Sequence, residues 1–334
     1  MRIAMVSIPY HSTPPKGYGG IERVVYELTE ELIRKGHEVV LFGAPGSFCS
    51  GKTIIVETAS GSVPSGITKG KAWLSEEPLY RAMKNYLDDN PVDVIHDWSF
   101  ENLYVLRHPN KFPFVISSCI PPTPGYARPN LVAASQAHAR LIKTSRYVHY
   151  GLHMPSYNYS CEKNEPMIHI AKIAPYKGQH LSMMAAFLAR KRLNIAGNVE
   201  DSRYFKLVVR PLLMLLPKIE YLGEVQGTHG VLKNAKALIQ APRWFDVFPL
   251  VILESLALGT PVIALRQGGI PEQIDHGVTG FICDSMFDMV KAMKMVKFLD
   301  PRACRSVAEE RFSVGRMAEQ YLSIYEDAIS GKRW

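Results

Sequence analysis

The sequence predicts an α/β protein made of two doubly wound domains. The chain opens with a strand, a helix and a strand within residues 3–43, which is the βαβ unit of a parallel sheet. A second series of the same kind begins near residue 167. The length of 334 residues also suits two domains, because a domain commonly holds about 150 residues.

The first half of the chain alternates between predicted strands and helices. Residues 21–36 are expected to form a helix that ends at Gly36, because their apolar residues recur at helical spacing. Short apolar runs bounded by Pro and polar residues are expected to be buried parallel strands: 3–9, 38–43, 92–95, 114–117 and 131–134. Residues 44–70, rich in Gly, Ser and Thr, and the Pro-rich residues 121–130 are expected to be surface loops.

The second half repeats this architecture after residues 151–166, whose turn-forming composition without periodicity is typical of a linker. Strands are expected over 167–173, 193–196 and 219–222, with a helix over 181–190. The last helix, about 314–330, carries apolar residues on one face. The sequence therefore predicts an N-terminal domain of residues 1–150 and a C-terminal domain of residues 151–313.

Composition limits the classes of ligand and compartment. The formal net charge of +8 and the pI near 9.1 favour anionic ligands such as nucleotides, nucleic acid or acidic lipid. Without a run of like charges or an RNA-binding aromatic motif, no nucleic acid partner is expected. The five cysteines are far apart and form no CxxC pair, which argues against a disulfide framework or a zinc site and fits a reducing cytosol.

The start of the chain and its hydropathy bear on localisation. Residues 1–10 lack the long apolar stretch and cleavage site of a signal peptide, and we interpret them as a first strand. No segment approaches eighteen consecutive apolar residues, so a transmembrane span is not expected. The basic charge permits contact with the inner face of a membrane, although we find no amphipathic basic helix that would demand it. The predicted location is the cytoplasm, and the charge is compatible with a peripheral contact at the inner face of the membrane.

The most informative stretch is 244–280, WFDVFPLVILESLALGTPVIALRQGGIPEQIDHGVTG. Asp246 lies in a predicted loop and Glu254 about two turns inside a predicted helix, an arrangement in which two acids serve one ligand beside free helix amides. A strand, a glycine turn at Gly268 and a further helix are expected to follow. The alternative is that Asp246 only caps the helix and Glu254 is solvated on its surface.

These residues resemble the signature of retaining, nucleotide-sugar-dependent glycosyltransferases of family four, the glycosyl transferases of group 1. Their E-x7-E motif corresponds to Asp246 and Glu254, and Asp246 is one methylene shorter than the glutamate usual at the first position. The GGIPE and GVTG segments match the usual continuation of the motif. The resemblance extends over nearly the whole chain. It implies the GT-B fold, in which two Rossmann-like domains face each other across a cleft and the terminal helix, about 314–334, returns to the first domain.

The resemblance also implies roles in donor binding for residues of the second domain. Glu254 would bind the ribose hydroxyls of the donor, and Asp246 would contact the transferred hexose or stabilise positive charge at its anomeric carbon. The amides of Phe248 and Leu250 would bind sugar or phosphate. Pro249 between them offers no N–H.

Two lysines in AKIAPYKGQ occupy the place where the family usually shows G-R-x-x-x-x-K-G. Lys172 and Lys177 would stabilise the negative charge that develops on the leaving diphosphate, in place of a metal ion. Lys172 stands where the family has Arg, so a point charge replaces bidentate recognition. The alternative is that both are ordinary solvated lysines.

The first domain supplies two further candidate segments. Gly19 and Gly20 lie in a loop between a strand and a helix, where the family has a G-G-x-E loop near the acceptor and the donor phosphates; a tight turn is the alternative. His96 and Trp98 follow a strand at the place of the family's H-x-H. His96 is expected either near the sugar or as a hydrogen-bonded core residue, and Trp98 is expected to stack on a sugar face.

The sequence thus predicts a retaining hexosyltransferase that uses a nucleotide-diphosphate sugar, no metal and no cofactor. Its acceptor is expected to be a hydroxyl of a sugar, of a lipid-linked molecule or of a small molecule. Two alternatives stay open, namely a non-catalytic homologue that binds nucleotide or sugar, and a GT-B phosphorylase. Retention implies front-face displacement in which the leaving phosphate helps to deprotonate the acceptor, so no protein base is assigned.

Overall fold

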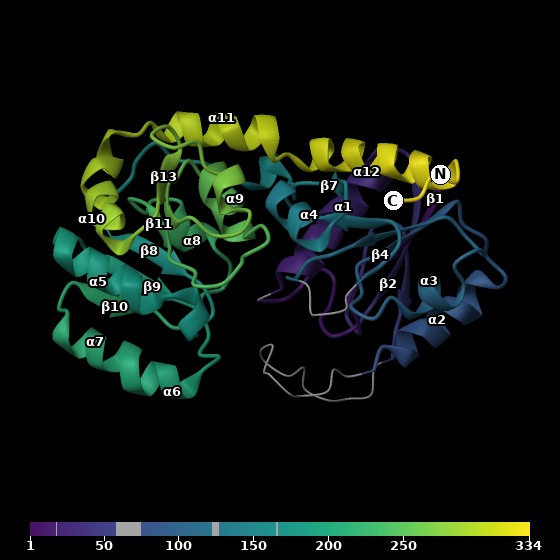
Figure 1. Ribbon diagram of the computed structural model, residues 1–334, viewed down its shortest axis with the longest axis horizontal. Helices are drawn as coiled ribbons and strands as arrows, with labels where there is room; N and C mark the ends of the chain where they lie inside the picture. The colour runs from purple at the N-terminus through teal and green to yellow at the C-terminus, as the bar shows by residue number, and fades with distance from the viewer. Residues whose placement is uncertain (18, 58–74, 122–126, 165) are drawn as a thin grey trace. The chain divides into compact units, whose positions relative to one another are not determined.

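The computed structural model describes residues 1–17, 19–57, 75–121, 127–164 and 166–334 (Figure 1). The chain divides into two compact units. Unit 1 comprises Met1–Leu152 and Val314–Trp334, and unit 2 comprises His153–Ser313. The point of division between Leu152 and His153 lies inside the linker-like stretch 151–166.

Unit 1 is built on a seven-stranded sheet whose pairings are all parallel, in the order β3-β2-β1-β4-β5-β6-β7. Its strands are β1 (Arg2–Val6), β2 (Glu38–Gly43), β3 (Lys52–Ile55), β4 (Val94–Asp97), β5 (Phe114–Ser117), β6 (Leu131–Ala133) and β7 (Arg146–Tyr147). The expected strands over 38–43 and 114–117 are confirmed with the same bounds. Each is an apolar run that the sheet buries on both faces.

The helices of unit 1 are α1 (Gly20–Arg34), α2 (Glu77–Leu87), α3 (Leu103–Arg107), α4 (Gln136–Ile142) and α12 (Val314–Ile329). α1 buries Val24, Val25, Leu28 and Leu32, which is the face that the helical spacing predicts. α12 packs against α1, β4 and β5, and so belongs to unit 1 although it ends the chain.

Unit 1 differs from the prediction in its connecting segments. The stretch 44–70 was expected to be loop, but it contains β3, which extends the sheet beyond β2. β3 shows no apolar alternation because it is an edge strand with partly exposed side chains. Within the two predicted loops, residues 58–70 and 122–126 lie outside the described residues.

Unit 2 is built on a six-stranded sheet, again parallel throughout, in the order β10-β9-β8-β11-β12-β13. Its strands are β8 (Met167–Ile170), β9 (Leu193–Ala196), β10 (Ile219–Tyr221), β11 (Leu238–Gln240), β12 (Val262–Leu265) and β13 (Gly280–Cys283). The prediction missed β11 and β13, which are short segments without a distinct periodic pattern.

Helices of unit 2 cover the sheet in two groups. α5 (Gln179–Ala189) packs against α10 (Met286–Met295) and against the helix formed by α6 (Ser202–Tyr204), η3 (Phe205–Val209) and α7 (Arg210–Leu215). Figure 1 shows α10, α5 and α7 side by side in this layer. α9 (Leu250–Ala257) packs instead against α8 (His229–Leu232) and α11 (Pro301–Arg311).

One helix of unit 2 was predicted wrongly. The helix expected after the glycine turn at Gly268 is a single 3₁₀ turn, η4 (Ile270–Glu272), and the chain then runs on to β13. Two further 3₁₀ turns, η1 (Met154–Ser156) and η2 (Pro175–Lys177), flank the start of unit 2 and its first strand. Short turns of this kind leave backbone amides and side chains at the strand ends.

Candidate active site

The strand order of unit 2 has one point where the chain changes direction across the sheet. From β8 the chain moves outward to β9 and β10, then returns to β11 on the other side of β8. Loops that leave β8 and β11 at their carboxyl ends therefore diverge, and ligands of doubly wound sheets bind at such a point. Lys172 and Lys177 follow β8, and Asp246 follows β11.

Lys177 and Asp246 meet at this point. The Lys177 ammonium donates to the Asp246 carboxylate at an Nζ–Oδ2 distance of 2.7 Å, and the two side chains are only 15% and 12% exposed. The same ammonium lies 4.9 Å from the centroid of the Trp244 ring. Lys177 is therefore held by an acid and an aromatic face of the neighbouring loop, and the alternative of a solvated lysine is wrong for it.

Two glycines allow the loops to approach each other. Gly178, at φ +71°, lies so close to the backbone of Ala241 that an added Cβ would come 1.9 Å from its carbonyl oxygen. An added Cβ at Gly268, at φ +54°, would come 1.9 Å from the carbonyl oxygen of Asp246. That same carbonyl accepts a hydrogen bond from the Gly269 amide at 2.9 Å. Glycine at these positions permits the backbone contact that fixes Lys177 and Asp246.

Lys172 has a different acidic neighbour. Its ammonium lies 3.3 Å from Glu200 Oε2, and the hydroxyl of Tyr176 donates to Glu200 Oε1 at 2.8 Å. Tyr176 also packs on Trp244 at 5.0 Å between ring centroids, which links this group to Lys177. The Lys172 side chain is 19% exposed, so it too is not an ordinary solvated lysine.

Sequence reasoning missed Glu200, Tyr176 and Trp244. Glu200 follows β9, the strand beside β8, and acids at the carboxyl end of a central strand were the available signal. Tyr176 and Trp244 are ordinary aromatic residues in the sequence, and only the fold brings their rings together.

Glu254 lies on α9 and is 4% exposed. The helix begins at Leu250 after Pro249, so Glu254 lies about one turn inside it and not two. No side chain caps this helix. Both parts of the alternative interpretation are therefore wrong, since Asp246 is not its cap and Glu254 is not solvated.

The two residues proposed to offer amides lie at the start of α9. Leu250 is its first residue, and an amide there has no acceptor within the helix. The Phe248 side chain is buried against Phe312, with ring centroids 5.9 Å apart, and anchors the loop. Gln273, the residue after η4, donates from Nε2 to the Pro249 carbonyl at 3.1 Å and so holds the start of α9.

In unit 1, the corresponding change of direction lies between β1 and β4. The loop after β1 reaches α1 through Gly19, the residue before its first turn, and Gly20, its first residue. Gly19 is buried, and an added Cβ would lie 2.6 Å from Pro15 Cβ, whereas Gly20 is exposed. Close packing therefore already requires glycine at position 19.

His96 and Trp98 both lie in the interior of unit 1, and for His96 this is the second of its two alternatives, a hydrogen-bonded core residue. His96 is fully buried, with Nδ1 2.6 Å from the Tyr325 hydroxyl and Nε2 2.8 Å from Ser117 Oγ. Burial holds its pKa well below the ordinary value, so the ring is neutral. Trp98 is 1% exposed and packs on His96 and on Tyr321 of α12. Sugar stacking by Trp98 does not fit this burial, because α12 covers the ring.

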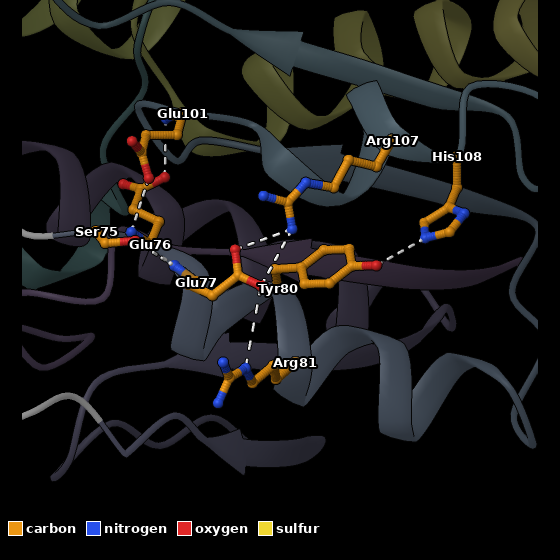
Figure 2. A network of polar contacts seen from close by, with 8 residues as sticks. All are labelled: Ser75, Glu76, Glu77, Tyr80, Arg81, Glu101, Arg107 and His108. Carbon is orange, nitrogen blue, oxygen red and sulfur yellow. Dashed lines mark hydrogen bonds and ion pairs between the residues drawn. The ribbon is translucent and has the colours of Figure 1, made fainter.

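An acidic residue that the sequence did not single out lies near the same strand end. The Glu76 carboxylate accepts from the amides of Phe100 and Glu101, while the Glu76 amide donates to the Glu101 carboxylate at 2.7 Å. Figure 2 shows this reciprocal pair beside Glu77, whose carboxylate accepts from Arg107 at 2.9 Å. Burial, and then the charge of Asp97, raise the pKa of Glu76 to about 7 although the amide hydrogen bonds oppose the shift.

The described residues contain no cluster of three or more His, Cys, Asp or Glu side chains with the arrangement of a metal site. None of the described helices has the length and apolar content to cross a membrane. Ser135 caps α4 by accepting from the His138 amide at 3.1 Å.

Both halves of the chain match models of a known protein family. A family model described as Glycosyltransferase Family 4 matches residues 18–148, and one described as Glycosyl transferases group 1 matches residues 160–302. N-acetyl-alpha-D-glucosaminyl L-malate synthase of Bacillus anthracis is 37% identical over 182 residues, 50% of this chain and 47% of that protein. The chain thus spans about half the length of this curated relative.

Solved structures share the fold over the whole chain. AviGT4, a glycosyltransferase involved in avilamycin A biosynthesis, superposes with a TM-score of 0.81 at 23% identity, covering 100% of this chain and 99% of its own. HepE of Anabaena in complex with UDP-glucose superposes with a TM-score of 0.67 at 15% identity, covering 99% and 100%. At these identities the likeness shows the fold.

The two sheets and these matches define a GT-B protein. The chain belongs to glycosyltransferase family 4, the glycosyl transferases of group 1, whose members are retaining enzymes. The predicted family and fold are therefore confirmed.

Proposed function

We propose that this chain transfers a hexose from a nucleotide-diphosphate sugar to an acceptor hydroxyl with retention of configuration, without a metal ion. The observation that carries the proposal is the meeting of Lys177 and Asp246 at the switch point of unit 2, with Lys172 close by. Family membership supplies the class of reaction. Unit 2 would bind the donor and unit 1 would bind the acceptor, and Gly19 and Gly20 would contribute backbone amides to donor binding.

Charge development determines what the two lysines would do. As the bond between the anomeric carbon and the phosphate oxygen breaks, negative charge grows on the diphosphate, and fixed cations stabilise it without reorganising. Lys177 is preorganised because Asp246 and Trp244 already hold its ammonium. Asp246 would thus act through Lys177, in addition to any contact with the hexose.

The remaining atoms balance without a protein base. The acceptor oxygen bonds to the anomeric carbon on the face that the phosphate leaves, and the acceptor proton passes to the departing phosphate oxygen. Glu254 would accept hydrogen bonds from the two ribose hydroxyls, for which a buried carboxylate is suited. The Leu250 amide, and that of Phe248, would bind sugar or phosphate near the helix start.

Donor and acceptor class rest on chemistry and on relatives. The UDP-glucose bound to HepE makes uridine diphosphate sugars the first to test as donors. The acceptor would be a hydroxyl of a sugar, of a lipid-linked molecule or of a small molecule, and the reaction would take place in the cytoplasm.

A panel of nucleotide sugars tests the proposal directly. Purified protein is incubated with each donor, and release of nucleoside diphosphate is measured for wild type, Lys177→Ala and Glu254→Ala. We expect at least one donor to be turned over and Lys177→Ala to lower kcat by about 10²- to 10³-fold. Lys233→Ala and Glu309→Ala, both exposed on unit 2, are matched controls that should leave turnover unchanged.

The same panel separates the alternatives. Turnover that requires inorganic phosphate and yields a sugar phosphate would identify a phosphorylase. Donor binding in a thermal shift assay without turnover of any donor would identify a binding homologue, since a ligand at 100 times its Kd stabilises a protein by about 2.7 kcal/mol. Equal rates for the site variants and wild type would overturn the assignment of the site.

A further inference from the structure

The helix of residues 202–215 exposes basic and large apolar side chains on one side. The stretch 202–219 contains no acidic residue and four basic ones: Arg203, Lys206, Arg210 and Lys218. All four are exposed. A solvated helix face usually mixes both signs of charge, so this face carries a one-sided positive field.

Large apolar side chains project from the same side. Leu207, Met214 and Leu215 are 75%, 72% and 72% exposed. Arg203, Leu207, Arg210 and Met214 follow one another at intervals of about one helical turn and therefore share a side. The opposite side, with Tyr204, Val209 and Leu216, is buried in the core of unit 2.

A second helix in the same layer repeats this combination. On α10 and the 3₁₀ turn η5 (Val296–Phe298), Phe287, Met295 and Phe298 are 67%, 50% and 70% exposed. The basic residues beside them, all exposed, are Lys291, Lys294 and Lys297. Asp288 lies 3.8 Å from Lys291 and offsets only one of these charges. α5, which packs between the two helices, adds Phe187 at 50% exposure.

We propose that this layer is a docking surface for an anionic membrane, and we call the outward residues of 202–218 and 287–298 the basic apolar face. Lys and Arg extend their ammonium and guanidinium groups to lipid phosphates while their stems and the exposed Leu, Met and Phe side chains enter the headgroup boundary. Anionic lipids attract such cations by about 1 kcal/mol each, which is about a fivefold gain in binding per residue.

Charge decides between this occupant and others. In a two-fold dimer the same patch meets itself, so Arg203, Lys206 and Arg210 would face like charges of the second copy. Nucleic acid would use the cations but gains nothing from three exposed aliphatic side chains on one helix. An anionic lipid surface satisfies both sets of residues, because its phosphates pair with the cations and its acyl boundary takes up the apolar side chains. A basic amphipathic helix was not predicted here because Pro211 and the β-branched pair at 208–209 interrupt the helical pattern in the sequence, although the helix continues through the π-helical turn η3.

Vesicle flotation tests the proposal without any turnover assay, so its outcome is independent of the proposed function. The protein is floated with vesicles of phosphatidylcholine alone and with vesicles containing 30% phosphatidylglycerol. We expect binding to the anionic vesicles only, weakened in 0.5 M NaCl because the Debye length falls to a few ångströms. Arg203→Glu/Arg210→Glu should lower the partition coefficient at least about 25-fold.

Two further variants make the result specific. Leu207→Ser/Met214→Ser/Leu215→Ser keeps the charge and should also reduce binding, with an unchanged Tm because these side chains are exposed. Lys233→Glu/Arg302→Glu makes the same change of charge at two exposed residues elsewhere on unit 2, and this variant should bind vesicles as the wild type does. Lys233 follows α8, and Arg302 lies in α11. The proposal would be overturned if this control lost as much vesicle binding as Arg203→Glu/Arg210→Glu, or if the wild type bound neutral and anionic vesicles equally. It would also be overturned if sedimentation showed a wild-type dimer that Leu207→Ser/Met214→Ser/Leu215→Ser dissociates.

Discussion

Lys177 donates to Asp246 at 2.7 Å across 69 positions of sequence, and both side chains are largely buried. The two residues come from loops that leave adjacent strands, β8 and β11, at the point where the sheet changes direction. Removing one partner of an ion pair at this depth should destabilise the protein strongly, because the other charge would then remain buried without a partner.

Asp246→Asn keeps the shape of the acid and removes its charge. We expect kcat/KM for the donor to fall about 10- to 100-fold, because Lys177 loses the partner that orients its ammonium. Asp246→Glu keeps the charge and should retain more activity than Asn. Asp284→Asn, which removes the acid of an exposed pair with Arg266 at 2.6 Å, is the matched control and should leave kcat/KM unchanged. Equal kcat/KM for Asp246→Asn and wild type would mean that the pair is only structural.

Gly268→Ala tests the close approach behind Asp246. The new Cβ would come 1.9 Å from the Asp246 carbonyl oxygen, so the loop must shift, and we expect both lower stability and at least about tenfold lower kcat. Gly277→Ala is the control, since Gly277 also has a positive φ, +82°, but has open space around it. Denaturation midpoints and donor kinetics of both variants separate backbone strain from displacement of Asp246. Equal effects of the two substitutions would argue against the displacement.

Glu200→Gln releases Lys172 from its acid but keeps an acceptor for the Tyr176 hydroxyl. Because the carboxylate competes with phosphate for the ammonium 3.3 Å away, we expect nucleoside diphosphate to bind about 3- to 10-fold more tightly. Isothermal titration with the nucleoside diphosphate of the active donor measures this change, with the exposed Glu220→Gln as the control. Weaker binding would show that Glu200 mainly positions Lys172.

Trp98→Phe and Trp244→Phe are a pair with opposite expectations. Trp98 is buried beneath α12, so Trp98→Phe should lower the free energy of unfolding by about 1 to 3 kcal/mol and leave the donor KM unchanged. Trp244 faces the Lys177 ammonium, so its substitution should raise the donor KM with little loss of stability. Donor kinetics give the KM of both variants, and chemical denaturation gives their free energy of unfolding. A raised donor KM for Trp98→Phe alone would restore the sugar-stacking role.

The raised pKa of Glu76 should make the stability of unit 1 depend on pH. Its folded-state pKa, about 7, lies above the ordinary value of 4.5, so the folded state holds this proton more tightly than the unfolded state does. The stabilising effect is complete below pH 4.5 and is lost as the pH rises through 7. Between these limits we expect a loss on the order of 3 kcal/mol, which Glu76→Gln should abolish. Denaturation of both proteins at pH 5 and pH 8 measures it, and an equal pH dependence in the variant would contradict the assignment.

Several elements could be predicted from the sequence because their signals are local. The apolar runs 38–43 and 114–117 are strands with those bounds, and the helical spacing in 21–36 identifies the buried face of α1. Lys172, Lys177, Asp246 and Glu254 were identified from the resemblance to the family motifs, which are also local, whereas Glu200, which follows β9, was missed.

What the tertiary structure decided depends on contacts between distant segments. Whether His96 and Trp98 face a ligand or the core depends on α12, which packs over them from more than 200 positions away. The partner of Lys172 is Glu200 because β9 lies beside β8, an order that no local pattern states. The sequence by itself determined the family, the fold class and the residue types available for chemistry. The strand order and helix packing decided which of these side chains meet and which are buried, because burial and pairing depend on neighbours that only the folded chain supplies.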